Sequence, residues 1–202
     1  GGNPYATMLS VGNSILTGAV YTNGVYNRLA TYGNAPYSVV ATALDVMQEN
    51  ERHILKSSTG ILYDAGEGNF LNTIKGIDLT NYDYLLTHFW LADMENYQIG
   101  TLNSVAGDGT LVGAILEILN YMRTSNGRCQ LLLASVPPSS YTIYGNNVFT
   151  GNYGNGSSIA DLDLIMKQLA GRMGWFCSKE ALNPVLCQVI LIGCGSMTGA
   201  HH

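Results

Sequence analysis

Charge is scarce in this sequence. Only 11% of its 202 residues are Asp, Glu, Lys or Arg, whereas an ordinary soluble domain has about 25%. The net charge is −5, and the 9 Lys and Arg residues form no basic stripe. A protein that follows a phosphate backbone needs such a stripe, so we expect no nucleic-acid partner. No apolar run approaches the ~20 residues of a membrane-spanning helix, so we expect no membrane span either.

The sequence also lacks the cysteine and glycine patterns of common cofactor sites. None of its 4 cysteines belongs to a Cys-x-x-Cys pair or has histidine at zinc-ligand spacing, so we expect no metal site. There is no P-loop and no Gly-x-Gly-x-x-Gly, which disfavours a nucleotide-binding protein and predicts no cofactor. Cys129 begins an apolar run and is expected in the core. Three cysteines lie near the C-terminus, and two of them could form one disulfide.

Uncharged polar residues take the place of charge. The chain has 24 glycines and 13 tyrosines, together with many asparagines. A surface kept in solution by amides and hydroxyls is typical of proteins that handle sugars outside the cell. We therefore expect an extracellular, cell-surface or virion-associated location.

Apolar runs of strand length alternate with helical patterns along the chain. The charged residues between 49 and 56, including His53, are interpreted as the solvated face of a helix. Strands followed by amphipathic helices favour right-handed crossovers and a mostly parallel sheet covered on both faces. No repeat or linker divides the sequence, so one domain over 1–202 is expected. The expected strands are 6–11, 60–63, 82–90, 131–136 and 185–192, and the clearest helices are 25–32, 110–126 and 158–169.

The first strand runs into a turn that carries a hydroxyl group. Gly12 permits a sharp turn after this apolar run, and Ser14 follows two residues later. A residue at this point lies at the carboxyl edge of the sheet, where open α/β sheets bind their ligands. Ser14 is therefore a candidate nucleophile. The structural alternative is a helix N-cap.

The order of motifs along the chain carries a family resemblance. A strand and a Gly-x-Ser turn come first, and a glycine loop follows at 64–70. A strand then ends in Trp90-Leu91-Ala92-Asp93, and His201 stands near the C-terminus. This order resembles the SGNH (GDSL-type) hydrolases, which are flavodoxin-like, three-layer esterases and lipases, many of which deacylate carbohydrates. The resemblance covers nearly the whole chain and implies a sheet of about five strands. The terminal helix that the family usually has is expected to be missing.

The resemblance implies roles for individual residues. Ser14 would be the nucleophile, with Asn13 where the family has aspartate. The N–H groups of Ser14 and of Gly68, or otherwise Gly66, would hold the oxyanion. His201 would be the general base.

Two positions depart from the family pattern. Ala92 stands in place of the oxyanion asparagine, and Thr198 in place of the aspartate that orients the base. Losing one oxyanion donor costs about 2.7–4 kcal/mol of barrier in known enzymes. Residues that are expected to support the site, or to replace what is lost, are Asn13, Gly66, Asn69, Asn72, His88, Asp93, Asn96 and His202.

Aromatic residues provide candidate sugar contacts. Trp90 is expected at the end of a strand, and Tyr141 and Tyr144 lie in a long polar loop at 139–156. Each of these side chains can stack on a sugar ring. The alternative is that each has only a structural role in packing.

These residues together predict a serine esterase that removes an O-acyl group, most simply acetyl, from a carbohydrate through an acyl-enzyme. Its partner would be an acylated carbohydrate or another small ester. The alternative is a catalytically weakened module that binds carbohydrate or has a structural role in a phage tail or cell-surface assembly. The acyl group, the glycan and the oligomeric state stay open.

Overall fold

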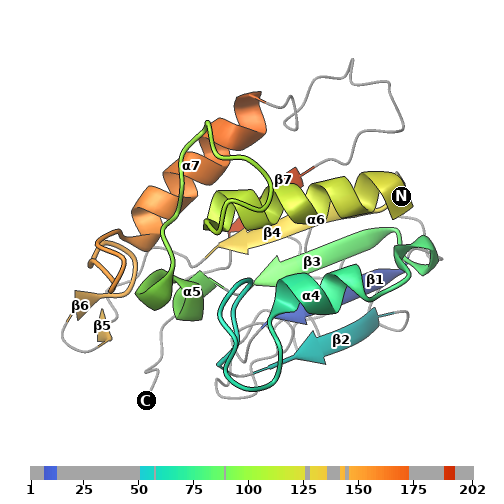
Figure 1. The fold of residues 1–202 in the computed structure, drawn as a ribbon, viewed down its shortest axis with the longest axis horizontal. Coiled ribbons are helices and arrows are strands. Elements are labelled where there is room, and N and C mark those ends of the chain that lie inside the picture. The colour runs from blue at the N-terminus through green and yellow to red at the C-terminus, as the bar shows by residue number, and fades with distance from the viewer. Residues whose placement is uncertain are drawn as a thin grey trace, which may run out of the picture.

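A parallel sheet organises the protein. The computed structural model describes residues 7–12, 51–56, 58–88, 90–125, 128–135, 142–143, 146–172 and 189–193. Within these ranges, five parallel strands form one sheet in the order β2-β1-β3-β4-β7 (Figure 1). They are β1 (Met8–Gly12), β2 (Glu51–Leu55), β3 (Tyr84–His88), β4 (Gln130–Ser135) and β7 (Val189–Gly193). The predicted α/β class with a parallel sheet is confirmed.

The chain starts in the interior of this sheet. β1 pairs with β2 on one side and with β3 on the other, and the order then continues outward through β4 to β7. This is the doubly wound order of flavodoxin-like folds, in which the direction of winding reverses between the first and third strands. Ligands of such sheets bind beside that point, at the carboxyl ends of the strands.

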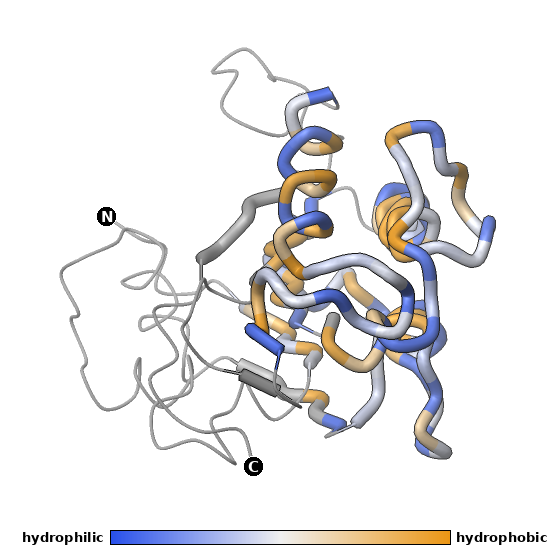
Figure 2. The backbone as a smooth tube through the Cα atoms, turned by 90° about the vertical axis from the view of Figure 1, so that its left-hand side faces the viewer, coloured by the Kyte–Doolittle hydropathy of each residue, from blue (hydrophilic) through white to orange (hydrophobic). Residues whose placement is uncertain are grey.

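Two helices cover one face of the sheet. α4 (Phe70–Lys75) and α6 (Leu111–Ser125) lie in front of the strands in Figure 1. Alternate strand residues such as Leu9, Leu85 and Leu131 belong to the same buried cluster as Phe70 and Ile115 from the helices. Figure 2 shows α6 nearly end-on, with hydrophobic residues toward the strands. The helix expected at 25–32 lies outside the described residues, so the layer on the opposite face stays a prediction.

The charged segment near residue 50 is a strand, and the expected helical face is wrong. Glu51–Leu55 forms β2, which pairs in parallel with Met8–Gly12. Among the described strands β2 is an edge, and edge strands carry charged residues because one side of their backbone faces solvent. The expected strand at 60–63 is also wrong, since Gly60 donates its N–H to the carbonyl of Tyr63 across a turn.

The two longest helices described, α6 and α7, start where the sequence predicts. The Thr110 hydroxyl accepts the N–H of Gly113 at 3.0 Å, which makes Thr110 the N-cap of α6. At the start of α7 (Ile159–Arg172), Ser158 and Asp161 form a reciprocal capping box with bonds of 2.8 and 3.1 Å. Cys129 is fully buried, as expected.

The third expected strand is shorter than the apolar run that predicted it. β3 ends at His88, and Trp90 already begins α5 (Trp90–Asn96). A 3-10 turn, η2 (Leu79–Asn81), precedes β3. Part of the long loop at 139–156 forms a small antiparallel pair, β5 (Thr142–Ile143) and β6 (Asn146–Asn147).

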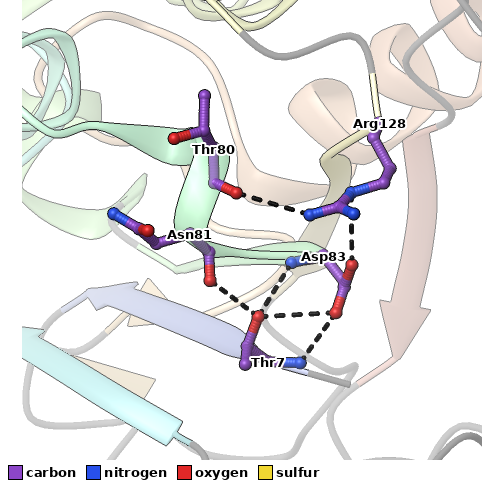
Figure 3. Close-up of polar contacts among 5 residues, drawn as sticks. All are labelled: Thr7, Thr80, Asn81, Asp83 and Arg128. Atoms are coloured by element: carbon purple, nitrogen blue, oxygen red, sulfur yellow. Dashed lines mark hydrogen bonds and ion pairs between the residues drawn. The ribbon is translucent and has the colours of Figure 1, made fainter. Parts of the chain in front are cut away.

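A polar network joins the amino ends of the central strands (Figure 3). The N–H of Thr7 donates to Asp83 Oδ2 at 3.0 Å, and the Thr7 hydroxyl donates to the carbonyl of Asn81 at 2.8 Å. Arg128 Nε lies 3.5 Å from Asp83 Oδ1, and its guanidinium also donates to the carbonyl of Thr80. These contacts set the register of β1 against β3 at the edge opposite the candidate site.

Removing the Asp83 carboxylate should destabilise the fold more than removing its cation. Asp83→Ala leaves the half-buried N–H of Thr7 without its acceptor, which we expect to cost about 1–2 kcal/mol. Arg128→Ala removes a solvent-exposed ion pair and should cost about 0–1 kcal/mol. Urea denaturation of both variants measures the two costs. Equal losses would contradict this ranking.

Candidate functional site

The candidate site lies where three neighbouring strands end together. In the parallel register, Gly12 at the end of β1 is opposite Leu55 of β2 and His88 of β3. The N–H of Lys56 extends the pairing by donating to the Gly12 carbonyl at 3.1 Å. The sequence that follows Gly12, the turn after Lys56 and the start of α5 therefore all leave the same edge of the sheet.

The predicted catalytic pair lies outside the described residues. Ser14 and Asn13 follow β1 directly, and His201 follows β7. Three strand spacings separate β1 from β7, or about 14 Å. The chain from Gly193 to His201 can extend over as much as ~28 Å. The topology therefore permits the predicted meeting of Ser14 and His201, which stays a prediction, as do the sugar contacts of Tyr141 and Tyr144.

The glycine loop after β2 is closed on itself. Gly66 and Gly68 have φ values of 91° and 82°, in the left-handed region that favours glycine. Their N–H groups donate to one oxygen, Asp64 Oδ1, at 2.7 and 2.9 Å. Gly68 or Gly66 can therefore act as the predicted oxyanion donor only after its bond to Asp64 breaks.

Lys56 fastens the same loop from the side of β2. Its ammonium donates to the carbonyls of Glu67 and of Gly68, the latter at 3.2 Å, and lies 3.4 Å from the Thr73 hydroxyl. Sequence reasoning placed Lys56 among solvated helix charges and missed this role. Lys56 lies one residue beyond β2, where residues reach the ligand-binding edge, but this position could not be recognised while the segment was interpreted as a helix.

Asn69 is part of the structure of this loop. Its side-chain oxygen accepts the N–H of Asn72 at 3.0 Å and so caps α4. Its side-chain amide donates to the carbonyl of Leu62 at 3.3 Å. Asn96, on α5, donates its amide to the carbonyl of Ala92. In this structure both amides are therefore engaged in contacts within the fold.

Asp93 joins α5 to the turn that precedes the glycine loop. Its Oδ2 accepts the N–H of Ile61 at 2.8 Å, and its Oδ1 accepts those of Leu62 and Tyr63 at 2.9 and 3.0 Å. The side chain is fully buried. Burial raises the pKa of Asp93 to about 6, and the three hydrogen bonds oppose that shift.

Gly60 fits directly against this carboxylate. A Cβ at residue 60 would lie 2.3–2.5 Å from the carboxylate atoms of Asp93. Sequence reasoning missed Gly60, although a glycine before an apolar turn is a signal for close backbone approach.

His88 is a buried imidazole at the end of β3. Its side chain is fully buried, and neither ring nitrogen has a hydrogen-bond partner among the described residues. Burial lowers its pKa to about 4, so the ring is neutral at pH 7. A pKa this low makes His88 a weak proton acceptor. Its supporting role in the site stays a prediction.

The tetrapeptide Trp90-Leu91-Ala92-Asp93 has a different setting from the one expected. Trp90 to Asp93 form the first turn of α5, so Trp90 begins a helix and does not end a strand. The side chain of Trp90 lies outside the described part of the molecule, and its contact with a sugar stays a prediction. Ala92 has no side chain that can donate a hydrogen bond.

Within the described ranges, no group of three or more His, Cys, Asp or Glu side chains is placed to hold a metal ion. None of the helices described is long and apolar enough to cross a membrane.

Comparison with known proteins supports the fold. The sequence matches no protein-family model and no curated protein. Solved structures match over 92% of this chain. They include a protein from Lactobacillus plantarum (TM-score 0.58, 14% identity, 76% of that chain) and a possible lipase from Chitinophaga pinensis (0.52, 13%, 66%). A carbohydrate acetylesterase family member from Sinorhizobium meliloti also matches (0.52, 17%, 82%). At these identities the likeness shows a shared fold.

Acid should destabilise the protein partly through His88. Because its pKa falls from 6.5 to about 4 on folding, the unfolded chain binds a proton at higher pH than the folded chain. The free energy of unfolding is therefore unaffected by His88 above about pH 6.5 and falls by about 3 kcal/mol as the pH drops from 6.5 to 4.

His88→Gln removes this titration. We expect the variant to lose less free energy of unfolding than the wild type between pH 7 and pH 4.5, measured by urea denaturation at each pH. The same acid-induced loss in both proteins would show that His88 is not buried in its neutral form.

Proposed function

We propose that the protein is a serine esterase of SGNH type. The observation that carries the proposal is the switch point of the sheet, where β1 ends at Gly12 between the ends of β2 and β3. The next residues in the sequence are Asn13 and Ser14, so a residue with a hydroxyl group comes soon after the strand that ends at the ligand-binding edge. The fold shared with the possible lipase and with the carbohydrate acetylesterase family member supports the same proposal.

The proposed reaction uses Ser14 as nucleophile and His201 as base. His201 takes the hydroxyl proton while Ser14 Oγ bonds to the ester carbonyl carbon, which gives a tetrahedral oxyanion. Collapse of this intermediate breaks the bond to the alcohol oxygen of the sugar, which receives the proton from His201. Water, deprotonated by His201, then attacks the acyl-enzyme, and the carboxylic acid leaves while Ser14 regains its proton.

The oxyanion would be held by backbone groups. Ser14 and Gly68 supply the N–H donors in this proposal, and Gly68 first has to leave Asp64 Oδ1. Ala92 contributes no donor, so fewer groups stabilise the intermediate than in the family pattern. We therefore expect slow turnover.

The substrate class is an O-acylated carbohydrate, with O-acetyl the simplest case. Low charge and abundant tyrosine suit a surface that meets sugars. The Sinorhizobium protein of the same fold belongs to a carbohydrate acetylesterase family. Trp90, Tyr141 and Tyr144 are proposed to contact the sugar, in an extracellular, cell-surface or virion setting.

Replacing the nucleophile should abolish turnover. Ser14→Ala removes the attacking oxygen, so release of p-nitrophenol from p-nitrophenyl acetate should fall to the uncatalysed rate. A fluorophosphonate probe should label the wild type and not the variant. Unchanged turnover would exclude the mechanism. A folded wild type that neither hydrolyses the ester nor reacts with the probe would instead indicate a binding module.

The C-terminal histidine pair supplies its own matched control. His201→Ala removes the proposed base and should lower kcat by about 10⁴-fold or more, as loss of such a base does in serine hydrolases. His202→Ala removes the adjacent imidazole and should leave kcat within about twofold. Steady-state kinetics on the same ester measures both. The opposite ranking would assign the base to His202, and two unaffected variants would exclude both histidines.

A further inference from the structure

Asp93 joins two segments that meet at the candidate site. It belongs to α5, and its carboxylate accepts three successive backbone N–H groups, from Ile61, Leu62 and Tyr63. These three residues belong to no helix or strand. The carboxylate is thus the acceptor that fixes the path of this turn.

The held turn leads directly into the glycine loop. Tyr63, whose N–H bonds to Asp93 Oδ1 at 3.0 Å, is followed in the chain by Asp64. Asp64 in turn accepts the N–H groups of Gly66 and Gly68. A shift of Tyr63 would therefore move the residue that sets the direction of both glycine N–H groups.

The same turn supports the start of α4. The N–H of Phe70 donates to the carbonyl of Gly60 at 3.0 Å, and that of Leu71 donates to the carbonyl of Ile61 at 3.1 Å. Both ends of the loop at 62–69 are consequently anchored to one short stretch of backbone, which is held by Asp93.

The fit around the carboxylate leaves little freedom. Asp93 is fully buried, and a Cβ on Gly60 would lie 2.3–2.5 Å from its carboxylate atoms. Real Cβ atoms do not approach other atoms this closely, so Gly60 and Asp93 fit together only without a side chain at position 60.

We propose that Asp93 is a positioning residue of the esterase: its carboxylate holds the 61–63 turn and thereby fixes where the glycine loop lies at the candidate site, so that the Gly68 N–H can reach the oxyanion once it leaves Asp64. This inference rests on the function proposed above. Asp93 acts through Tyr63 and Asp64, and it is not itself assigned a contact with the substrate.

Only a carboxylate satisfies all three donors. Its two oxygens share them, one with Ile61 and one with Leu62 and Tyr63. The nearly isosteric amide of Asp93→Asn has one oxygen, so its NH₂ group would face at least one backbone N–H. The variant should therefore change the turn with little change in volume.

The test compares Asp93→Asn with a control that makes the same change from carboxylate to amide where the side chain accepts a single backbone N–H, which an amide oxygen can also accept. In Asp161→Asn, the altered residue caps α7, where Asp161 accepts the N–H of Ser158 at 2.8 Å. For Asp93→Asn we expect kcat on p-nitrophenyl acetate to fall about 10- to 100-fold per folded molecule, the effect of a small misplacement of catalytic groups. We expect KM within twofold, and Asp161→Asn should keep both constants within about twofold.

Amide hydrogen exchange on the folded variants separates positioning from general loss of stability. Asp93→Asn should speed exchange selectively at Ile61, Leu62 and Tyr63, because these N–H groups lose acceptors. Uniform acceleration across the sheet, or a kcat within twofold of the wild type, would overturn the inference.

A second variant decides the matter if Asp93→Asn does not fold. Gly60→Ala keeps every hydrogen-bonding group and pushes a methyl group against the carboxylate. It should lower kcat at least about tenfold with the same selective exchange at 61–63. Wild-type kcat in folded Gly60→Ala would overturn the inference.

Ser14→Ala keeps the two proposals distinct. If Ser14→Ala abolishes hydrolysis while Asp93→Asn and Gly60→Ala retain wild-type kcat, the esterase stands and the role of Asp93 falls. If Ser14→Ala hydrolyses the ester as fast as the wild type, the proposed function falls, and the role of Asp93 in it falls with it.

Discussion

Buried backbone N–H groups that lie outside helices and strands need hydrogen-bond acceptors, and this requirement determines the structure of the candidate site. The turn at 61–63 presents three such groups in succession. The carboxylate of Asp93, on the helix α5 that follows β3, accepts all of them. The turn after β2 and the helix after β3 are thereby joined across the end of β1. The glycine loop, its Asp64 contacts and the start of α4 all build on this junction.

Four of the five described strands of the parallel sheet and the starts of α6 and α7 could be predicted because local signals and tertiary packing agree there. The buried strands appear in the sequence as apolar runs. Thr110 and the Ser158–Asp161 capping box predicted the starts of their helices. β2 was missed because an edge strand has only one strand neighbour and can carry charges that resemble a solvated helix. Its evidence is the pairing with β1, which lies more than 40 positions away and leaves no trace in local periodicity.

The sequence predicted many of the residues of the candidate site, but it did not predict their hydrogen-bond partners. Glycines 66 and 68, Asn69 and Asp93 were all singled out from the sequence, yet their partners were not. Asp64, Lys56 and Gly60 complete the loop through contacts that depend on how three segments fold together. The two buried titratable groups also respond oppositely: burial raises the pKa of Asp93 and lowers that of His88, because desolvation disfavours whichever form is charged. Acid therefore places a charge on the buried His88 side chain, and base places one on the buried Asp93 side chain.

The contact between Gly60 and Asp93 also restricts how this sequence can change over generations. A larger residue at position 60 forces the buried carboxylate to shift, whereas a smaller residue at position 93 would first open the space. Lineages that alter both positions should consequently substitute 93 before 60 more often than the reverse.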